Sequence, residues 1–372
     1  MRIALVITEL HPGGAEKCCV NLACYLQARG HHVAVWQLWP EPPPDRRQLT
    51  AQLDRHGIVW RSGNARSAWQ FLRTAHWLRR ELFAFQPDVT QSFLFHANLA
   101  ASLAHRSFPR RVPSRLYGGA RVAQPERWRQ RLQRWAVGPM DKLVCVSHSV
   151  AEHCHTREGI PTDKLLVIPN GLEIPALANE NSLSWSQLGL PQKSRVLLFV
   201  GRLTEQKGIV DFMARVVPEL LKRLPEHHVV LMGDGEQATQ LRSLVEQSEA
   251  AARVHLVGWQ PQAVDWMRVA ELLVLPTRYE GMPNVILEAM AVGKPVASFD
   301  VDGVRELLGD APTSAAQIVQ PLDWPALGDA IVALADDREL QLRCGQANAA
   351  RVQQHFQLTD QLALYEQLYQ SR

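Results

Sequence analysis

The chain has 372 residues, of which 46% are hydrophobic and 21% charged, and this suggests two globular domains of ~150 residues whose cores need no disulfide or structural metal. The net charge of +3 conceals an asymmetry: residues 1–170 hold 23 Lys and Arg against 12 Asp and Glu, whereas residues 171–372 hold 17 against 25, so we expect the basic half to meet an anionic partner. No run reaches the ~18 apolar residues of a membrane-spanning helix and no signal peptide opens the chain, so we expect a cytoplasmic protein.

Short β-branched runs in the first half predict strands over Ile3–Ile7, Val33–Gln37, Val89–Phe93 and Lys142–Val146. An amphipathic helix is predicted over about 15–28, where Gly30 closes it, and a second helix over 67–85. The proline-rich segment 40–45 predicts a surface loop between them.

A second series follows a polar stretch over 178–185. Strands are predicted over Arg195–Val200, His228–Met232, Leu272–Pro276 and Pro295–Ser298. Helices are predicted over 210–223, over 283–291 with a proline near its start and a glycine after its end, and over 359–369. Alternating strands and helices favour doubly wound parallel sheets. We therefore predict two Rossmann-like domains joined near 170–175, with ligands beyond the carboxyl ends of the strands.

The six cysteines form no C-x-x-C pair, and three of them fall on the first predicted helix. This usage is typical of reduced cysteine acting as a small buried apolar side chain, and it does not favour a zinc site or a disulfide framework.

The segment Arg278–Ala289 combines two carboxylates with a helix start. Pro283 suits a first helical turn, so the N–H groups after it would favour an anion such as a diphosphate. Glu280 precedes this turn, and Glu288 lies ~7.5 Å further along the helix axis. Each carboxylate can accept hydrogen bonds from sugar hydroxyls. The alternative is that Glu280 is a helix-start charge and Glu288 a solvated helix residue.

Two further loops follow predicted strands. In Val200–Gly208, Gly201 allows a tight turn, and Arg202 and Lys207 offer two cations to a diphosphate. The alternative is a basic surface loop. In Glu9–Glu16, two adjacent glycines permit close approach to the backbone, but they do not form the dinucleotide-binding fingerprint. The alternative there is a flexible turn that caps the helix.

Taken in order, these motifs resemble the large family of retaining GT-B glycosyltransferases, family four in the usual classification. The resemblance runs from Met1 to about Leu308 and is most specific over 199–308, which includes Gly233-Asp234-Gly235, Val257-Gly258 and Gly293-Lys294-Pro295-Val296. Val146–Ser149 and Ile168–Gly171 also resemble the family's sequence before its domain crossover.

The resemblance implies an α/β, GT-B fold: two Rossmann-like, doubly wound parallel-sheet domains facing a central cleft. Residues 1–172 would form the acceptor-binding domain, and residues 173–355 the nucleotide-sugar-binding domain. The C-terminal helix within 356–372 would pack back on the first domain.

The resemblance also implies roles for individual residues. Glu288 would bind the donor ribose, Glu280 would face the transferred sugar, and Arg202 and Lys207 would stabilise the departing diphosphate. His96 would line the sugar pocket, although a structural histidine is the alternative. The remaining donor-binding residues would be Gly13, Gly14, Gly201, Gly233, Val257, Gly281, Met282, Pro283, Asn284 and Val285.

The implied reaction transfers a sugar from a nucleotide-sugar to a glycan or lipid-linked acceptor, with retention of configuration at the anomeric carbon. The donor is expected to be a UDP-sugar, and the pathway to be cell-surface polysaccharide or glycolipid synthesis. No cofactor is expected, since the nucleotide-sugar is a substrate. No metal is expected either: Asp300-Val301-Asp302 has the spacing of a metal site, but it lies in a segment that the family uses otherwise. The alternatives are a nucleotide-sugar epimerase or a degenerate partner subunit. A phosphorylase lacks its pyridoxal-phosphate lysine context here, and an oxidoreductase lacks its glycine fingerprint.

Arginine and tryptophan are interleaved in two segments of the basic half, a pattern that suits an anionic membrane surface. We therefore predict peripheral binding at the inner face of the plasma membrane. The alternative is that the tryptophans are core residues and the arginines a solvated face. Nucleic acid is not favoured, because no recognised module accompanies the charge. The residues concerned are Trp69, Leu72, Arg73, Trp77, Arg79 and Arg80, and then Arg127, Trp128, Arg129, Arg131, Leu132, Arg134 and Trp135.

Overall fold

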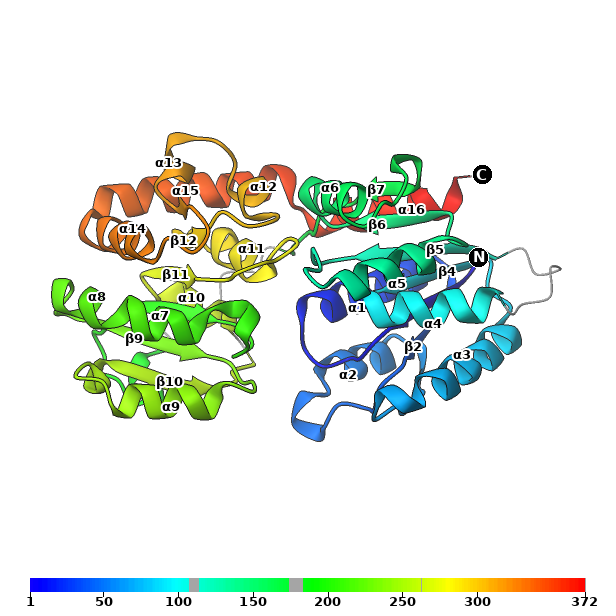
Figure 1. Ribbon diagram of the computed structural model, residues 1–372, viewed down its shortest axis with the longest axis horizontal. Coiled ribbons are helices and arrows are strands. Elements are labelled where there is room, and N and C mark those ends of the chain that lie inside the picture. The colour runs from blue at the N-terminus through cyan, green and yellow to red at the C-terminus, as the bar shows by residue number, and fades with distance from the viewer. Residues whose placement is uncertain (107–113, 174–182, 262, 372) are drawn as a thin grey trace. The chain divides into compact units, whose positions relative to one another are not determined.

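The fold was analysed in a computed structural model that describes residues 1–106, 114–173, 183–261 and 263–371. The chain divides into two compact units, Met1–Asn170 with Thr359–Arg372, and Gly171–Leu358. Each unit is a parallel β-sheet with helices on both faces (Figure 1). Most of the predicted polar stretch at 178–185 lies outside the described residues.

The first unit contains a seven-stranded sheet in the order β3-β2-β1-β4-β5-β6-β7, with every pair parallel. Its central strands are buried almost throughout, as expected for a sheet covered on both faces. The strands are β1 (Arg2–Ile7), β2 (His32–Gln37), β3 (Val59–Ser62), β4 (Val89–Phe93), β5 (Arg115–Ala120), β6 (Lys142–Cys145) and β7 (Leu165–Val167).

The helices that connect these parallel strands cover both faces of the sheet. Neighbouring helices α3, α4 and α5 pack side by side on one face, and α1 and α2 pack together on the other. Small alanines on α4 pack against Trp36 and Leu78 in a core cluster between sheet and helices. The helices are α1 (Gly14–Ala28), α2 (Gln48–Arg55), α3 (Phe71–Phe85), α4 (Phe95–Arg106), α5 (Arg127–Val137) and α6 (His148–Thr156).

The last helix, α16 (Leu358–Gln370), belongs almost wholly to the first unit. Its Tyr369 hydroxyl donates to Gln91 Oε1 at 3.2 Å, and its ring stacks on Tyr117 with centroids 5.7 Å apart. On the α1 side, the Tyr25 hydroxyl donates to Glu366 Oε2 at 3.0 Å. Burial of two tyrosine rings and these hydrogen bonds hold the chain end against the N-terminal sheet.

The second unit contains a six-stranded parallel sheet in the order β10-β9-β8-β11-β12-β13. Its strands are β8 (Arg195–Val200), β9 (His227–Met232), β10 (Val254–Gly258), β11 (Leu272–Leu275), β12 (Val296–Phe299) and β13 (Ile318–Val319). Its helices are α7 (Ile209–Arg215), α8 (Val217–Arg223), α9 (Ala238–Glu246), α10 (Ala263–Val269), α11 (Asn284–Ala291), α12 (Val304–Leu308), α13 (Pro312–Ala315), α14 (Trp324–Asp336) and α15 (Arg338–His355).

The predicted strands are all present: β4 and β8 coincide with the predicted ranges, and no boundary of the others differs by more than one residue. One predicted helix is wrong as a single element: 210–223 divides into α7 and α8 at Val216, and Pro218 lies in the first turn of α8. The helix predicted from 67 begins as an α-helix only at Phe71, after a 3₁₀ turn. The sequence reading missed five strands, namely β3, β5, β7, β10 and β13.

The six cysteines are all buried, as predicted for cysteine that acts as a small apolar side chain. Among the described residues, no helix is both long enough and apolar enough to cross a membrane.

Candidate active site

The predicted site residues of the second unit lie at the carboxyl ends of β8, β9, β10 and β11, and in α11. In a parallel sheet these ends share one edge, so loops that are distant in sequence meet there. The loop after β8 accepts a hydrogen bond at Gln206 O from Arg278 N, at 2.8 Å, and the Gln206 amide donates to Tyr279 O at 2.9 Å. The β8 and β11 loops therefore form one joined surface.

At the centre of this surface, Lys207 forms an ion pair with Glu280, from Nζ to Oε1. The Thr277 hydroxyl donates toward the same Oε1 at 3.0 Å. The side chains of Lys207 and Glu280 are only 12% and 8% exposed, so the partners of this carboxylate are protein groups rather than bulk water. The structure thus brings together the two residues that the sequence assigned to the diphosphate and to the sugar.

Glycines allow the β8 and β9 loops to pack backbone against backbone. A Cβ on Gly233, whose φ is +145°, would lie 1.9 Å from Gly201 O. Gly201 N donates to Met232 O at 3.0 Å, and Gly233 N donates to Gly258 O at 2.9 Å. Val257 is the extra residue of a bulge in β10, where the register with β9 shifts, and bulges commonly redirect backbone groups beside active sites.

The loop before α11 is held from its other side by Gly303. This glycine has φ +77°, and a Cβ there would lie 2.0 Å from Gly281 O and 2.8 Å from Met282 Cα. Gly281, Met282 and Pro283 are all buried. The turn that leads into the helix is therefore fixed by close packing of the backbone.

Helix α11 begins at Asn284, so Pro283 is the residue before the first turn and not part of it. The first intrahelical bond to Pro283 O comes from Ile286 N at 3.1 Å. Asn284 and Val285, half-buried, occupy the N-terminal turn, where the helix dipole favours an anion. Glu288 lies one turn further along and is buried, so the alternative of a solvated helix residue is wrong.

Arg202 and Asp300 differ from the residues above, because neither side chain is held in the joined surface of the β8 and β11 loops. The Arg202 side chain is exposed, and it has no ion pair or hydrogen bond with another residue that the structure describes. The guanidinium is therefore available to a ligand, but it is not positioned by the protein. Asp300 pairs with Arg305 on α12, which gives this carboxylate a structural role.

In the first unit, Gly13 is the N-cap of α1 in extended conformation, and Gly14 is the first helical residue. The carboxylate of buried Glu16 folds back over Gly13, and a Cβ on Gly13 would lie 2.3 Å from its Oε2. A glycine here therefore leaves room for a helix-start carboxylate.

His96 lies on the first turn of α4, half-buried between Trp39 and Phe95, with ring centroids 5.4 Å and 5.3 Å away. Burial and, to a smaller extent, the nearby Arg129 guanidinium lower the pKa of His96. The imidazole is therefore biased toward its neutral form. The residue before this turn, Leu94, has φ +72°, a strained backbone conformation of the kind found at functional sites.

The sequence reading missed three residues that shape the second unit's site. These are Thr277, which binds the Glu280 carboxylate, Gly303, and Gly208, whose φ is +65° and whose Cβ would lie 2.2 Å from Pro276 O. Gly208 ends the quoted segment Val200–Gly208, and Thr277 directly precedes the quoted segment Arg278–Ala289, so both could have been singled out. Gly303 has no sequence signal beyond being a glycine after a strand.

Comparison with solved structures defines the class of fold. The chain aligns with Anabaena HepE in complex with UDP-glucose, with a TM-score of 0.83 and 19% identity over 99% of both chains. It aligns with the sucrose-phosphate synthase of Thermosynechococcus elongatus with a TM-score of 0.81, also at 19% identity, over 99% of this chain and 98% of that one. The fold is that of the GT-B glycosyltransferases.

Matches to protein-family models define the family of the chain. Residues 12–174 match "Glycosyltransferase Family 4" and residues 194–337 match "Glycosyl transferases group 1". The chain belongs to this family, as its motifs predict.

Two relatives illustrate the range of activities within this similarity. The α-D-kanosaminyltransferase of Streptomyces kanamyceticus is 34% identical over 42% of this chain and 40% of its own length. The UDP-Gal:α-D-GlcNAc-diphosphoundecaprenol α-1,3-galactosyltransferase of Escherichia coli is 28% identical over 57% and 55%. The chain thus spans about half the length of the curated relatives it matches.

Proposed function

We propose that the protein transfers a sugar, with retention of configuration, from a nucleotide-sugar donor to a glycan or lipid-linked acceptor. The observation that carries this proposal is the buried Lys207–Glu280 pair, placed beside the α11 N-terminus and Glu288 at one edge of the second sheet. A nucleotide-sugar has a ribose, a diphosphate and a sugar, and this edge offers a separate group to each.

In this proposal the second unit binds the donor. Glu288 accepts hydrogen bonds from the ribose hydroxyls, and the first turn of α11 faces the diphosphate with its N–H groups. Val257, at its bulge, presents backbone to the base. UDP is the favoured carrier because HepE, the same fold at a TM-score of 0.83, binds UDP-glucose, and because a family relative is named for transfer from UDP-Gal.

Negative charge grows on the diphosphate oxygen as the bond to the sugar breaks. Lys207, Arg202 and the α11 dipole would stabilise that charge, which is the electrostatic contribution expected of preorganised donors. Glu280, fixed by Thr277 and Lys207, would accept hydrogen bonds from the sugar hydroxyls. This scheme assigns no step to a metal or cofactor.

The first unit would bind the acceptor, with His96 lining the sugar pocket in its neutral form. A neutral imidazole can both donate and accept a hydrogen bond, which suits contact with uncharged hydroxyls.

A membrane-bound acceptor is supported by a second observation. On α5, Trp128, Leu132 and Trp135 are spaced one turn apart and are 55%, 41% and 41% exposed, and Trp69 before α3 is 96% exposed. Exposed tryptophans beside arginines suit the headgroup level of a membrane. Trp77 packs against the core cluster and Trp128 contacts the ring of buried Phe95 edge-on, which fits the alternative of core tryptophans and solvated arginines. The large exposed fractions of Trp69, Trp128 and Trp135 support the membrane proposal.

Retention is tested with the donor alone. The purified chain is incubated with UDP-glucose or UDP-galactose, and the sugar released by slow hydrolysis is observed by proton NMR before mutarotation. The proposal predicts the α-anomer of the sugar as the first product. Release of the β-anomer would contradict retention while leaving sugar transfer intact.

Membrane binding is tested by flotation with vesicles of phosphatidylcholine, with and without phosphatidylglycerol. We expect the chain to float with the anionic vesicles and the Trp128→Ala/Trp135→Ala variant to stay behind. Equal flotation of both proteins, or no salt-sensitive binding by either, would remove this part of the proposal.

A further inference from the structure

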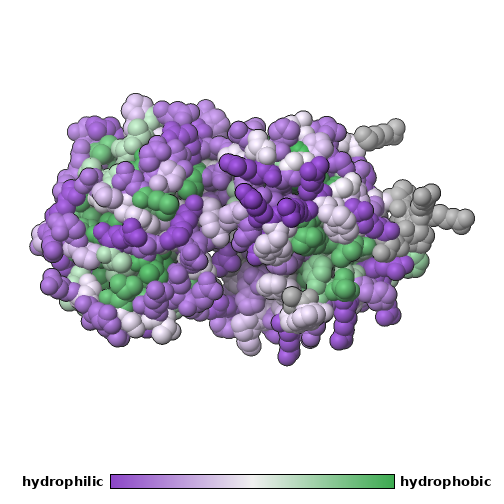
Figure 2. All heavy atoms as spheres, viewed as in Figure 1, coloured by the Kyte–Doolittle hydropathy of each residue, from purple (hydrophilic) through white to green (hydrophobic). Residues whose placement is uncertain are grey.

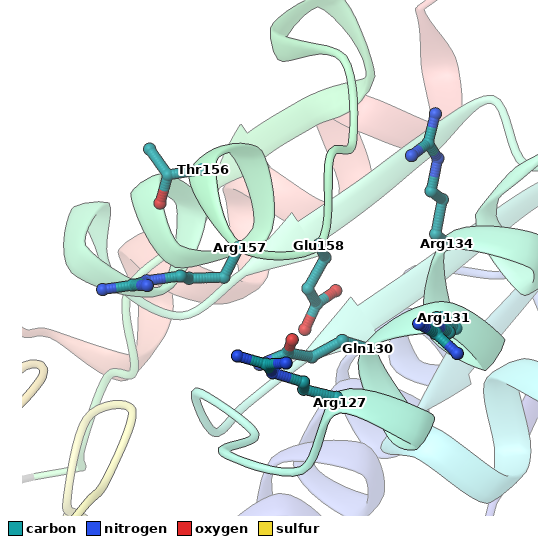
Figure 3. A pocket seen from close by; sticks show the side chains of 7 residues that line it. All are labelled: Arg127, Gln130, Arg131, Arg134, Thr156, Arg157 and Glu158. Atoms are coloured by element: carbon teal, nitrogen blue, oxygen red, sulfur yellow. The ribbon is translucent and has the colours of Figure 1, made fainter.

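A basic hollow of about 380 Å³ lies in the first unit, between α5 and the end of α6. Four arginines line it: Arg127, Arg131, Arg134 and Arg157 (Figure 3). In Figure 2, strongly hydrophilic side chains project from the surface at the place where α6 lies in Figure 1. Since a water takes about 30 Å³ in the liquid, the hollow has room for a phosphate group with several waters.

The arginines of this hollow are not neutralised by the protein. None of the four forms an ion pair with a carboxylate among the residues that the structure describes. Arg127, Arg131 and Arg134 recur at one-turn spacing on α5, so the three side chains leave the same side of the helix. Figure 3 shows their ends spreading from there around the hollow, with Arg134 directed away from Arg127. The partial negative charge at the α6 C-terminus, about half a unit, is small beside four full positive charges. Guanidinium groups also match a phosphate by forked hydrogen bonds.

A buried carboxyl group points into the same hollow. The Glu158 side chain is only 3% exposed, and its Oε2 has no hydrogen-bond partner among the described residues. Figure 3 shows this carboxyl directed toward Gln130 and Arg127 of α5. A buried polar atom without a partner carries a free-energy penalty that a ligand can relieve.

Burial raises the pKa of Glu158 to about 7, against a smaller opposing hydrogen bond from Cys154. In its neutral form this carboxyl is a hydrogen-bond donor, which an oxyanion can accept. In its ionised form it repels an anion. The groups nearest to this carboxyl are His153, whose Nε2 is 4.0 Å from its Oε1, and Cys154, both on α6. The arginines that line the same hollow are Arg127, Arg131, Arg134 and Arg157, and Arg121 lines a neighbouring one.

We propose that this hollow is a phosphate-binding site, in which the surrounding arginines supply the positive charge that attracts the phosphate and Glu158 donates a hydrogen bond to one phosphate oxygen. The phosphate group belongs either to a water-soluble, phosphate-bearing acceptor or to a phospholipid headgroup. That biological use rests on the proposed function, whereas the binding itself does not.

Sulfate is a suitable first probe, because it is a tetrahedral dianion whose charge is constant between pH 6 and 8.5. Binding of sodium sulfate to the whole chain is measured by titration calorimetry. We expect the Arg131→Ala/Arg134→Ala variant to bind at least about tenfold more weakly, since each charge-assisted hydrogen bond contributes at least that factor. The matched control is Arg73→Ala/Arg80→Ala, which removes two exposed arginines from α3. An equal loss in the control, or no loss in the first variant, would overturn the proposal.

The role of Glu158 is tested by pH. Sulfate affinity should fall as pH rises from 6 to 8.5, because ionisation removes a donor and adds a repelling charge. In Glu158→Gln, which keeps a donor without the charge, affinity should stay high at pH 8.5. A pH dependence unchanged in this variant would exclude Glu158 from the site.

Two further probes identify the source of the phosphate. Competition by glycerol phosphate against sulfate, with flotation on phosphatidylglycerol vesicles unaffected by the arginine double variant, would indicate a soluble acceptor. Flotation that requires Arg131 and Arg134 would indicate a lipid headgroup. The two proposals can fail independently. If the protein binds sulfate at this hollow but binds no nucleotide-sugar, the proposed function fails while the phosphate-binding site stands.

Discussion

The ammonium group of Lys207 donates to Oε1 of Glu280, although 73 positions separate the two residues in the sequence. Removing the cation in Lys207→Met leaves a buried carboxylate without its ionic partner, so we expect a loss of about 3 kcal/mol in the free energy of unfolding. Donor hydrolysis should fall roughly 10²–10³-fold, as when one preorganised group that stabilises the transition state is removed. Urea denaturation and steady-state rates measure the two effects.

The double variant Lys207→Met/Glu280→Gln separates stability from catalysis. It removes both charges of the pair, so its unfolding free energy should return close to that of the wild type, while its activity stays low. Recovery of activity together with stability would show that the pair has only a structural role.

Gly303 supports the loop before α11, which leads to a second prediction. Gly303→Ala adds a Cβ 2.0 Å from Gly281 O at a φ of +77°, so the loop must move and donor affinity should fall. The matched control is Gly189→Ala, which has a φ of +82° but nothing within 4 Å of its Cβ. The control should lose only the roughly 1 kcal/mol of the left-handed backbone and keep donor affinity, as measured by thermal shift. Equal donor affinity in both variants would contradict the role assigned to Gly303.

The sequence predicted those strands that are continuous apolar runs, because such a run is visible in the sequence without knowledge of its neighbours in the fold. β1 and β8 are continuous apolar runs between turn signals, and both are buried strands. β5 was missed because Gly118 and Gly119 break its pattern; in the structure Gly119 is needed where the backbone of β4 approaches, since its Cβ would lie 2.9 Å from Ser92 O. A residue pattern alone does not show such a contact.

For the candidate site, the positions of the residues along the chain could be predicted from the sequence, but their contacts could not. The motifs placed Glu280, Glu288 and Lys207 at strand ends or on the following helix, because the order of strands and helices is readable along the chain. Their pairing, the Thr277 hydrogen bond and the support from Gly303 depend on which loops of the folded sheet become neighbours. The break between α7 and α8 was readable in principle, since Pro218 removes a backbone donor from any continuous helix there.

A third prediction concerns stability and pH. The pKa of Glu158 is raised to about 7 in the folded protein, from a reference value of 4.5. The folded state therefore holds this proton more tightly than the unfolded chain, and its contribution to stability is lost as pH rises from about 4.5 to 7. Above pH 7, Glu158→Gln should be more stable than the wild type by roughly 3 kcal/mol, whereas at pH 4.5 the two should be similar. Urea denaturation at pH 4.5 and 8 measures this difference, and a constant difference would contradict it.

The assignment of Glu288 to the donor ribose gives the most direct test of nucleotide-sugar binding at this edge of the second sheet. Thermal shift and hydrolysis are measured for the wild type, for Glu288→Ala and for Glu246→Ala, an exposed glutamate on α9, with UDP-, GDP-, ADP- and dTDP-sugars. The account predicts stabilisation and slow hydrolysis with the UDP-sugars, both lost in Glu288→Ala and kept in Glu246→Ala. Stabilisation by none of the four nucleotide classes, or stabilisation that persists in Glu288→Ala, would contradict it.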